Sequence, residues 1–161
     1  MQHENEQLIE CFYRAFQRLD WQAMSDCYHE DIWFSDPVFT DLRSDQVANM
    51  WHMLCDKAEE FDLQYSHISA DDHYGSARWI ASYRFSQTGR RVRNVIFAEF
   101  QFKEGKIIRH SDHFSFWKWA ISALGLPGVL FGWSGRFKRK VQQKALAGLR
   151  AYSKKARKAF S

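Results

Sequence analysis

The spacing of apolar residues changes at Phe61, and this change constrains the fold of the chain more than any other feature. Before Phe61, apolar residues recur every three or four positions over residues 7–19, 21–28 and from 44 or 45 to about 60, which is the period of amphipathic helices. After it, apolar and polar residues alternate, as they do in half-buried strands. The sequence therefore predicts three helices followed by strands, which is an α+β fold.

Four segments beyond Phe61 have the alternation of strands, at residues 63–67, 79–85, 94–102 and 108–114. Residues typical of turns separate them at 71–75, 87–89 and 103–106. A further short strand is expected at 32–34, ending at Asp36-Pro37. The last four strands are predicted to form an antiparallel meander.

Charge separates residues 118–161 from the rest of the chain. This segment carries 11 of the 23 Lys and Arg residues and none of the 19 Asp and Glu residues. We therefore divide the chain into a domain at 1–116 and a basic helical extension at 117–161. Gly and Pro interrupt the apolar run at 117–133, so it cannot form one straight helix. An apolar stripe with helical spacing then passes through Phe137, Val141, Ala145, Leu149, Tyr152, Ala156 and Phe160.

The extension has three interpretations. Its apolar stripe can dock a helix on the chain's own domain. Alternatively, the extension lies in the interface of an anionic membrane, with Trp117, Trp119 and Trp133 at the depth of the headgroups. Binding of nucleic acid by the Lys and Arg residues is disfavoured, because no stacking motif accompanies the charge.

The composition is that of a folded protein. Hydrophobic residues make up 45% of the chain and aromatic residues 17%, so aromatic side chains must fill a core or line a cavity. The three cysteines form no CxxC pair, which indicates reduced thiols. Since the first residues are polar and no apolar run is long enough to span a bilayer, we expect a cytoplasmic protein, peripheral to the membrane if the extension binds lipid.

Asp36 is a candidate proton-transfer residue. It lies between the apolar pairs Trp33-Phe34 and Val38-Phe39, so its carboxylate stands where neighbouring side chains enter a core. Burial of a carboxylate raises its pKa, which suits it to exchange protons near neutral pH. The alternative is a turn residue, because Asp-Pro is common in turns.

His110 and Asp112 are the other candidate ionisable groups. They are two residues apart on a predicted strand and so share one face, where they can hydrogen-bond or flank a ligand. Asp112 can instead form a structural ion pair with Arg78, Arg93 or Arg109, and His110 can be an ordinary core or rim histidine. His113 lies on the opposite face, so we expect no metal site.

The order of these elements resembles the nuclear transport factor 2-like superfamily over about residues 5–116, and the segments 28–31 (YHED), 36–39 (DPVF) and 109–114 (RHSDHF) carry the resemblance. That superfamily includes ketosteroid isomerase, limonene-epoxide hydrolase and SnoaL-like polyketide cyclases. The resemblance implies a cone, in which a bent sheet wraps round the helices and encloses one deep, mostly apolar pocket. It also implies a homodimer that forms through the outer face of the sheet.

The resemblance places Asp36 at the position of the general base of ketosteroid isomerase. The helix-1 tyrosine and the oxyanion-hole aspartic acid of that enzyme are replaced here by Phe12 and Ala98, which argues against steroid isomerisation. Limonene-epoxide hydrolase needs an Asp-Arg-Asp set, of which only Asp112 is present. Trp79 and Ala81 stand at the other two positions.

These expectations combine into one leading hypothesis. The cone binds a small apolar molecule that carries a carbonyl, epoxide or hydroxyl group, and Asp36 or Asp112 transfers a proton in an isomerase, cyclase or hydrolase reaction without a cofactor or metal. His110 is the third candidate catalytic residue. The competing hypothesis is a non-catalytic ligand-binding or interaction module whose basic extension binds a membrane or a partner. The pocket is predicted to be lined by Phe12, Phe16, Phe34, Trp51, Tyr65, Trp79, Tyr83, Ile96, Phe100 and Phe114.

Overall fold

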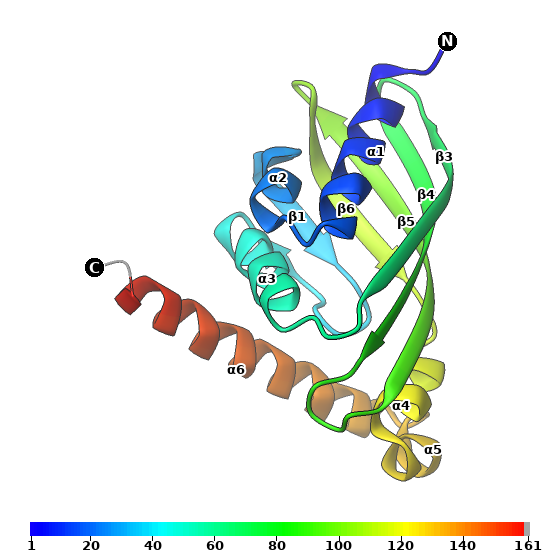
Figure 1. Cartoon of the computed structure of the whole chain (residues 1–161), viewed down its shortest axis with the longest axis vertical. Helices are drawn as coiled ribbons and strands as arrows, with labels where there is room; N and C mark the ends of the chain where they lie inside the picture. The colour runs from blue at the N-terminus through cyan, green and yellow to red at the C-terminus, as the bar shows by residue number, and fades with distance from the viewer. Residues whose placement is uncertain (160–161) are drawn as a thin grey trace.

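The computed structural model describes residues 1–159. The predicted α+β fold is confirmed: a curled sheet packs against N-terminal helices, and a helical extension follows it (Figure 1). The elements, in chain order, are α1 (Glu4–Gln17), α2 (Trp21–Asp26), β1 (Tyr28–Ser35), β2 (Leu42–Arg43), α3 (Asp45–Asp56), β3 (Asp62–Ala70), β4 (Tyr74–Arg84), β5 (Arg91–Lys103), β6 (Lys106–His113), α4 (Phe116–Leu124), α5 (Leu126–Phe131) and α6 (Gly135–Ala159).

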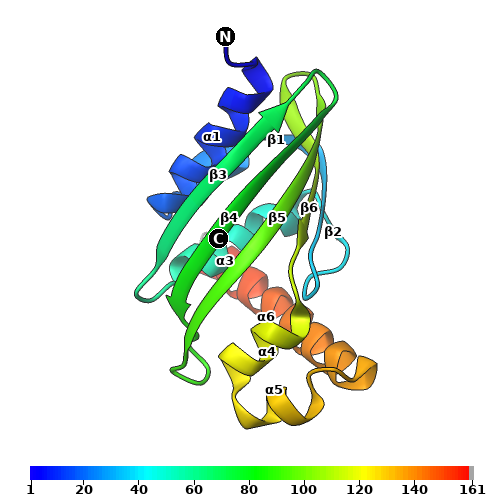
Figure 2. The same ribbon diagram turned by 90° about the vertical axis from the view of Figure 1, so that its right-hand side faces the viewer.

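The sheet has the strand order β2-β1-β6-β5-β4-β3 within the described range. The predicted meander β3–β6 is present, and β1 extends it by pairing in parallel with β6. Helices α1, α2 and α3 cover the concave face (Figure 1), whereas none of the helices in residues 1–159 crosses the outer face of β3, β4 and β5 (Figure 2). The inner face is therefore the one that can hold a buried site.

The boundary between α2 and β1 differs from the prediction. Residues 21–28 were expected to be helical and only 32–34 extended, but α2 ends at Asp26 and β1 begins at Tyr28. The reason is tertiary: Tyr28 pairs with Ile107 of β6, and the Ile107 amide donates to the Cys27 carbonyl at 2.9 Å. The helix α3 also ends early, at Asp56 rather than near residue 60.

A bulge in β6 changes which residues face the core. The alternation predicts Ile108 on the same face as His110, but Ile107 is the fully buried residue. Phe102 pairs with Ile107 and Gln101 with Arg109, so Ile108 has no opposite residue. An unpaired residue shifts the alternation by one position, and from His110 to His113 the predicted faces hold.

The extension docks on its own domain. Leu149 of α6 is buried in the main core, and α6 contacts α3. In α4, Trp119 and Ala120 form a second apolar cluster with Val92 of β5. The predicted interruption of the run at 117–133 is confirmed, because Gly125 separates α4 from α5. Phe160, the last residue of the predicted stripe, lies outside the described residues.

Candidate active site

Asp36 begins a tight turn directly after β1. Its Oδ1 accepts hydrogen bonds from the amides of Val38 at 2.7 Å and Phe39 at 2.6 Å, and its own amide donates to the Phe39 carbonyl at 2.8 Å. Asp71 makes the same three bonds, with His73 and Tyr74, at 2.8, 2.8 and 2.9 Å. The interpretation of Asp36 as a turn residue is therefore confirmed.

The two turns differ in their surroundings. Asp71 is exposed, and the two amide bonds hold its pKa below the usual value. Asp36 is half-buried, and burial raises its pKa to about 7 although the same two bonds oppose the shift. The charge of Asp112 adds a smaller increase. Asp36 is thus both a turn residue and an acid poised near neutral pH.

The extension covers the Asp36 turn. The side-chain amide of Gln142 in α6 donates to the Pro37 carbonyl at 2.9 Å. Val38 packs against both apolar clusters, and the Trp119 indole N–H of α4 donates to the Tyr83 hydroxyl at 3.0 Å. Helices α4 and α6 therefore limit the access of water to Asp36.

A chain of hydrogen bonds crosses the apolar interior. The Trp51 indole N–H donates to the Tyr28 hydroxyl at 2.9 Å, and this hydroxyl lies 2.8 Å from Nδ1 of His110. Nε2 of His110 lies 3.0 Å from Oδ1 of Asp112, which also accepts from the Trp79 indole N–H at 3.3 Å. His110 is 0% exposed and Asp112 3%. We call these five residues the buried relay.

Only one arrangement of protons satisfies every donor of the buried relay. An indole N–H can only donate, so the Tyr28 oxygen accepts from Trp51 and its own hydrogen must go to His110. Nδ1 of His110 is then the acceptor, and Nε2 carries the hydrogen that binds Asp112. The geometry assigns a neutral His110, protonated on Nε2, beside an ionised Asp112 that accepts two N–H donors.

The predicted ion pair between Asp112 and an arginine is wrong. Asp112 pairs with Ala98 across the sheet, and Ala98 with Ala77, so these three residues share the inner face. The three candidate arginines, which are Arg78, Arg93 and Arg109, are an odd number of positions from these inner residues and lie on the outer face. Arg109, for example, stacks on the Trp33 ring at 4.1 Å.

Tyr13 was not among the predicted site residues. Its side chain is 0% exposed, and its hydroxyl has no hydrogen-bond partner within residues 1–159. Burial raises its pKa well above the usual value, with a contribution from the charge of Asp112. The spacing Ile9, Tyr13, Phe16 would have placed it on the inner face of α1. Tyr13 supplies a buried hydroxyl next to position 12, where the resemblance found only Phe12.

The predicted pocket residues lie together, but their rings pack against one another. Phe12, Phe34 and Phe100 all have ring centroids within 5.5 Å of that of His110. Tyr65, Tyr83 and Phe114 are half-buried at the edge of the cluster, and the other predicted lining residues are buried. The aromatic set is therefore a core, with Asp36 at its rim.

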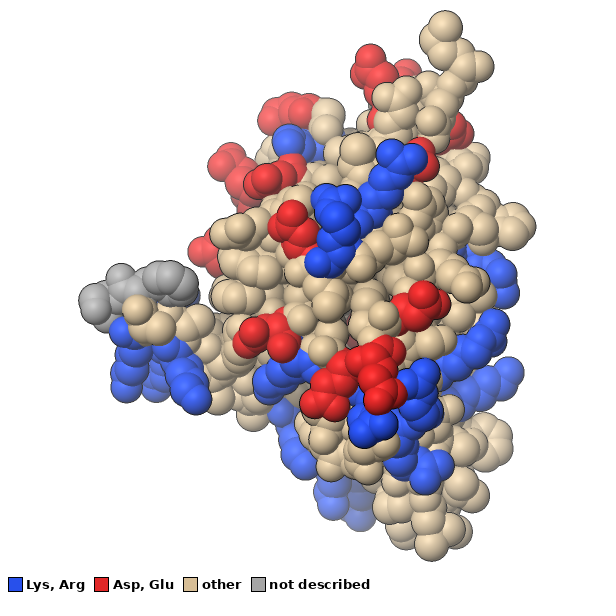
Figure 3. Space-filling view, in the orientation of Figure 1, with Lys and Arg blue, Asp and Glu red and all other residues tan. Residues whose placement is uncertain are grey.

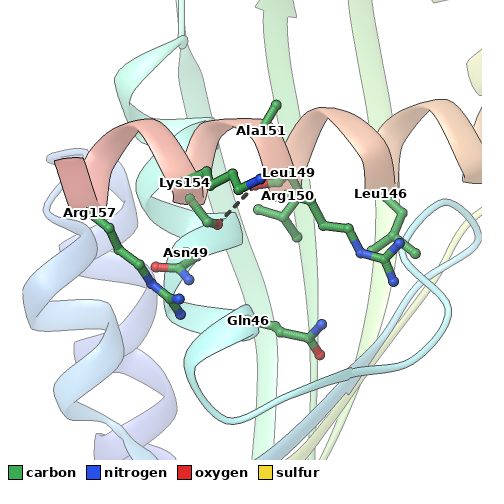
Figure 4. A pocket seen from close by; sticks show the side chains of 9 residues that line it. Gln46, Asn49, Leu146, Leu149, Arg150, Ala151, Lys154 and Arg157 are labelled. Carbon is green, nitrogen blue, oxygen red and sulfur yellow. Dashed lines mark hydrogen bonds between the residues drawn. The ribbon is translucent and has the colours of Figure 1, made fainter.

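Two hollows lie elsewhere on the molecule. One, of about 550 Å³, separates α3 from α6 and is bordered by Gln46, Asn49, Arg150 and Arg157 (Figure 4). The other, of about 680 Å³, lies over strands β3 to β6 and includes Arg109. Neither is lined by the three predicted catalytic residues. Within residues 1–159, no three His, Cys, Asp or Glu side chains are grouped as metal ligands.

The sequence profile of the SnoaL-like domain matches residues 9–110, from the buried face of α1 to the histidine of the buried relay. The chain belongs to the SnoaL-like domain family. No curated protein matches it in sequence.

The solved structures share its fold at low identity. An LEH-like epoxide hydrolase from M. tuberculosis is 19% identical, with a TM-score of 0.64 over 79% of this chain and 95% of the other. A candidate polyketide cyclase from Xanthomonas campestris is 20% identical, with a TM-score of 0.63 over 74% and 96%. A protein with a ketosteroid isomerase-like fold from Catenulispora acidiphila, in complex with trimethylamine, is 10% identical, with a TM-score of 0.65 over 75% and 94%. The predicted superfamily is confirmed.

The raised pKa of Asp36 makes the stability of the protein depend on pH. The folded state prefers the protonated acid, so its contribution is complete below about pH 4, the unfolded pKa, and is lost as the pH rises through about 7. Relative to Asp36→Asn, wild-type protein should lose on the order of 2–4 kcal/mol between these limits. Urea unfolding across this pH range measures the difference. Asp71→Asn is the matched control: it retains Asp36 and should lose stability with rising pH as wild type does, so wild type should show no such fall relative to it. A parallel pH dependence of wild type and Asp36→Asn would contradict the assignment.

Two tyrosine substitutions test the buried relay. Tyr28→Phe leaves the Trp51 N–H and Nδ1 of His110 without partners, and should lower the free energy of unfolding by about 1–3 kcal/mol for each unsatisfied group. Tyr13→Phe removes a hydroxyl that has no partner in the described structure, and should be neutral or stabilising. Chemical denaturation measures both. Equal losses of unfolding free energy in the two variants would show that the hydrogen bonds of Tyr28 do not stabilise the protein.

Proposed function

We propose that this SnoaL-like protein is a cofactor-independent enzyme that moves a proton on a small apolar molecule bearing a carbonyl or epoxide group, with Asp36 exchanging the proton. The observation that carries the proposal is the contrast between two turns with the same hydrogen bonds. Burial raises the pKa of Asp36 to about 7, whereas the pKa of exposed Asp71 is lowered. An acid–base catalyst is most effective when its pKa lies near the working pH.

The polar groups inside the cone have distinct roles in this proposal. The charge of Asp112 raises the pKa of both Asp36 and Tyr13, although burial is the larger cause in each case, so the three groups act on one another. The charge of Asp112 increases the affinity of Asp36 for a proton, and His110 donates its Nε2 hydrogen to Asp112. The hydroxyl of Tyr13, which has no hydrogen-bond partner within residues 1–159, is the donor that we propose for a ligand oxygen.

Ligand entry in this proposal takes place at the rim of the aromatic cluster. Val38, Tyr83 and Phe114 join the main core to the cluster under α4. Side chains there are half-buried, unlike the packed rings around His110. The names of the structural neighbours, an epoxide hydrolase and a candidate polyketide cyclase, support the class of small molecule proposed.

A specific observation favours the alternative function. The rings of the predicted pocket fill the interior, which is the arrangement expected of a module that binds without catalysis. In either case we expect a homodimer through the outer face of the sheet, where Tyr74 and Phe97 are exposed and none of the described helices covers the strands (Figure 2).

Proton exchange with solvent separates the two functions before the natural ligand is known. Wild-type protein is incubated in heavy water with a panel of cyclic ketones, and NMR follows the loss of protons next to the carbonyl. A parallel panel of epoxides is assayed for ring opening. Asp36→Asn should lower the rate on any active compound by about a hundredfold or more, because it removes the proton acceptor.

The Asn side chain retains the carbonyl oxygen that accepts the two amide bonds of the turn, so the fold should persist. Asp71→Asn makes the same change in an exposed turn and should leave the rate unchanged. Wild-type rates in Asp36→Asn would rule out Asp36 as the base. Failure of wild-type protein on both panels would favour the binding module.

A further inference from the structure

An apolar knob projects from the molecule at α4 and α5. We define the knob as residues 116–134, which lie at the foot of the molecule in Figure 1. Few large apolar side chains of residues 1–159 are exposed, and those of the knob are 46–72% exposed. They are Trp117, Leu126, Val129, Leu130, Phe131 and Trp133.

Backbone packing and hydrogen bonds fix the conformation of the knob, so that these side chains remain exposed to solvent. Gly125 turns the chain between α4 and α5 with a φ of 70°, which favours glycine. Gly128 lies so close to the Ala120 carbonyl that any side chain at 128 would collide with it. The β4–β5 turn fixes α4 in place, because Thr88 and Arg90 donate to the carbonyls of Ala123 and Ser122 at 2.5 and 2.9 Å.

Positive charge surrounds the knob. Lys118 in α4 and Arg136, Arg139 and Lys140 at the start of α6 are exposed, and residues 118–159 contain no acidic residue. Figure 3 shows a tan surface at the foot of the molecule, where the knob lies, and Lys and Arg atoms beside it and along the outer edge of α6. A surface of this kind complements an apolar layer bordered by negative charge.

We propose that the knob inserts into the interface of an anionic lipid membrane, with α6 lying against the headgroups. Leu126, Val129 and Leu130 would enter the acyl region, and Trp117 and Trp133 would lie at headgroup depth, where indole rings are favoured. None of the helices in residues 1–159 is both long and apolar enough to cross a bilayer. The attachment is therefore peripheral, and combines apolar burial with charge attraction.

The stripe of α6 itself is not the inserting surface. Leu149 is buried against the domain, and Ala145, Leu146 and Tyr152 pack on the same core. Only the polar and basic face of α6 is free to meet a membrane, and that face can bind headgroups without entering the acyl region. In this proposal the knob therefore inserts into the membrane, and the basic face of α6 attracts the anionic headgroups.

Vesicle co-sedimentation of the full-length protein tests the proposal. Wild-type protein should bind vesicles of phosphatidylcholine with phosphatidylserine, and bind vesicles of phosphatidylcholine alone at least about tenfold more weakly. Leu130→Glu or Leu126→Glu should each lower binding to the anionic vesicles by about tenfold or more, because a carboxylate would enter the apolar layer. Arg139→Gln with Lys140→Gln should lower it by a similar factor.

Leu54→Glu is the matched control, because Leu54 is 39% exposed on α3, away from the knob. It should bind as wild type does. Circular dichroism and thermal melting confirm that each variant folds, and two knob variants guard against the failure of one.

Absence of wild-type binding would overturn the proposal. So would salt-sensitive binding that neither knob substitution changes, since that result describes adsorption by charge alone. Gel filtration with light scattering tests whether the knob contacts a second copy of the chain instead of a membrane. A wild-type protein that binds no vesicles and forms an oligomer, which Leu130→Glu converts to monomer, would show that the knob joins two copies.

Discussion

The buried hydrogen bonds of Asp112 are the interaction on which the polar interior depends. A carboxylate at 3% exposure is costly unless strong donors satisfy it. The N–H groups of His110 and Trp79 do so, and the hydrogen bond that Nδ1 of His110 accepts from Tyr28 favours the tautomer with its hydrogen on Nε2. The direction of each hydrogen bond thus fixes the next one, and the whole chain supports one negative charge inside an aromatic core.

Burial at the rim of the core and the charge of Asp112 together raise the pKa of Asp36. Its turn is chemically the same as the turn of Asp71, so the local backbone does not explain the difference in pKa. The difference arises because α4 and α6 lie over one turn and solvent over the other. The extension therefore contributes to the chemistry of the domain as well as to its packing.

Periodicity predicted most of the fold, because the helices and the meander each bury one regular face. It failed where a contact with a distant segment decided the conformation, as at Tyr28 and at the Ile108 bulge. The pairing of His110 with Asp112 followed from a spacing of two. The partners Trp51 and Tyr28 come from other elements, so no local pattern shows them, and the pKa of Asp36 depends on segments more than 80 residues further along the chain.

The protonation of His110 tests the account most directly. Nitrogen-15 NMR of the histidine ring at neutral pH, with the signal assigned through His110→Gln, distinguishes the two neutral tautomers from the charged ring. We predict a neutral ring with hydrogen on Nε2 and a bare Nδ1 that accepts from Tyr28. A hydrogen on Nδ1, in either a neutral or a charged ring, would contradict it, because the Tyr28 hydroxyl would then have no acceptor and the relay would not run toward Asp112.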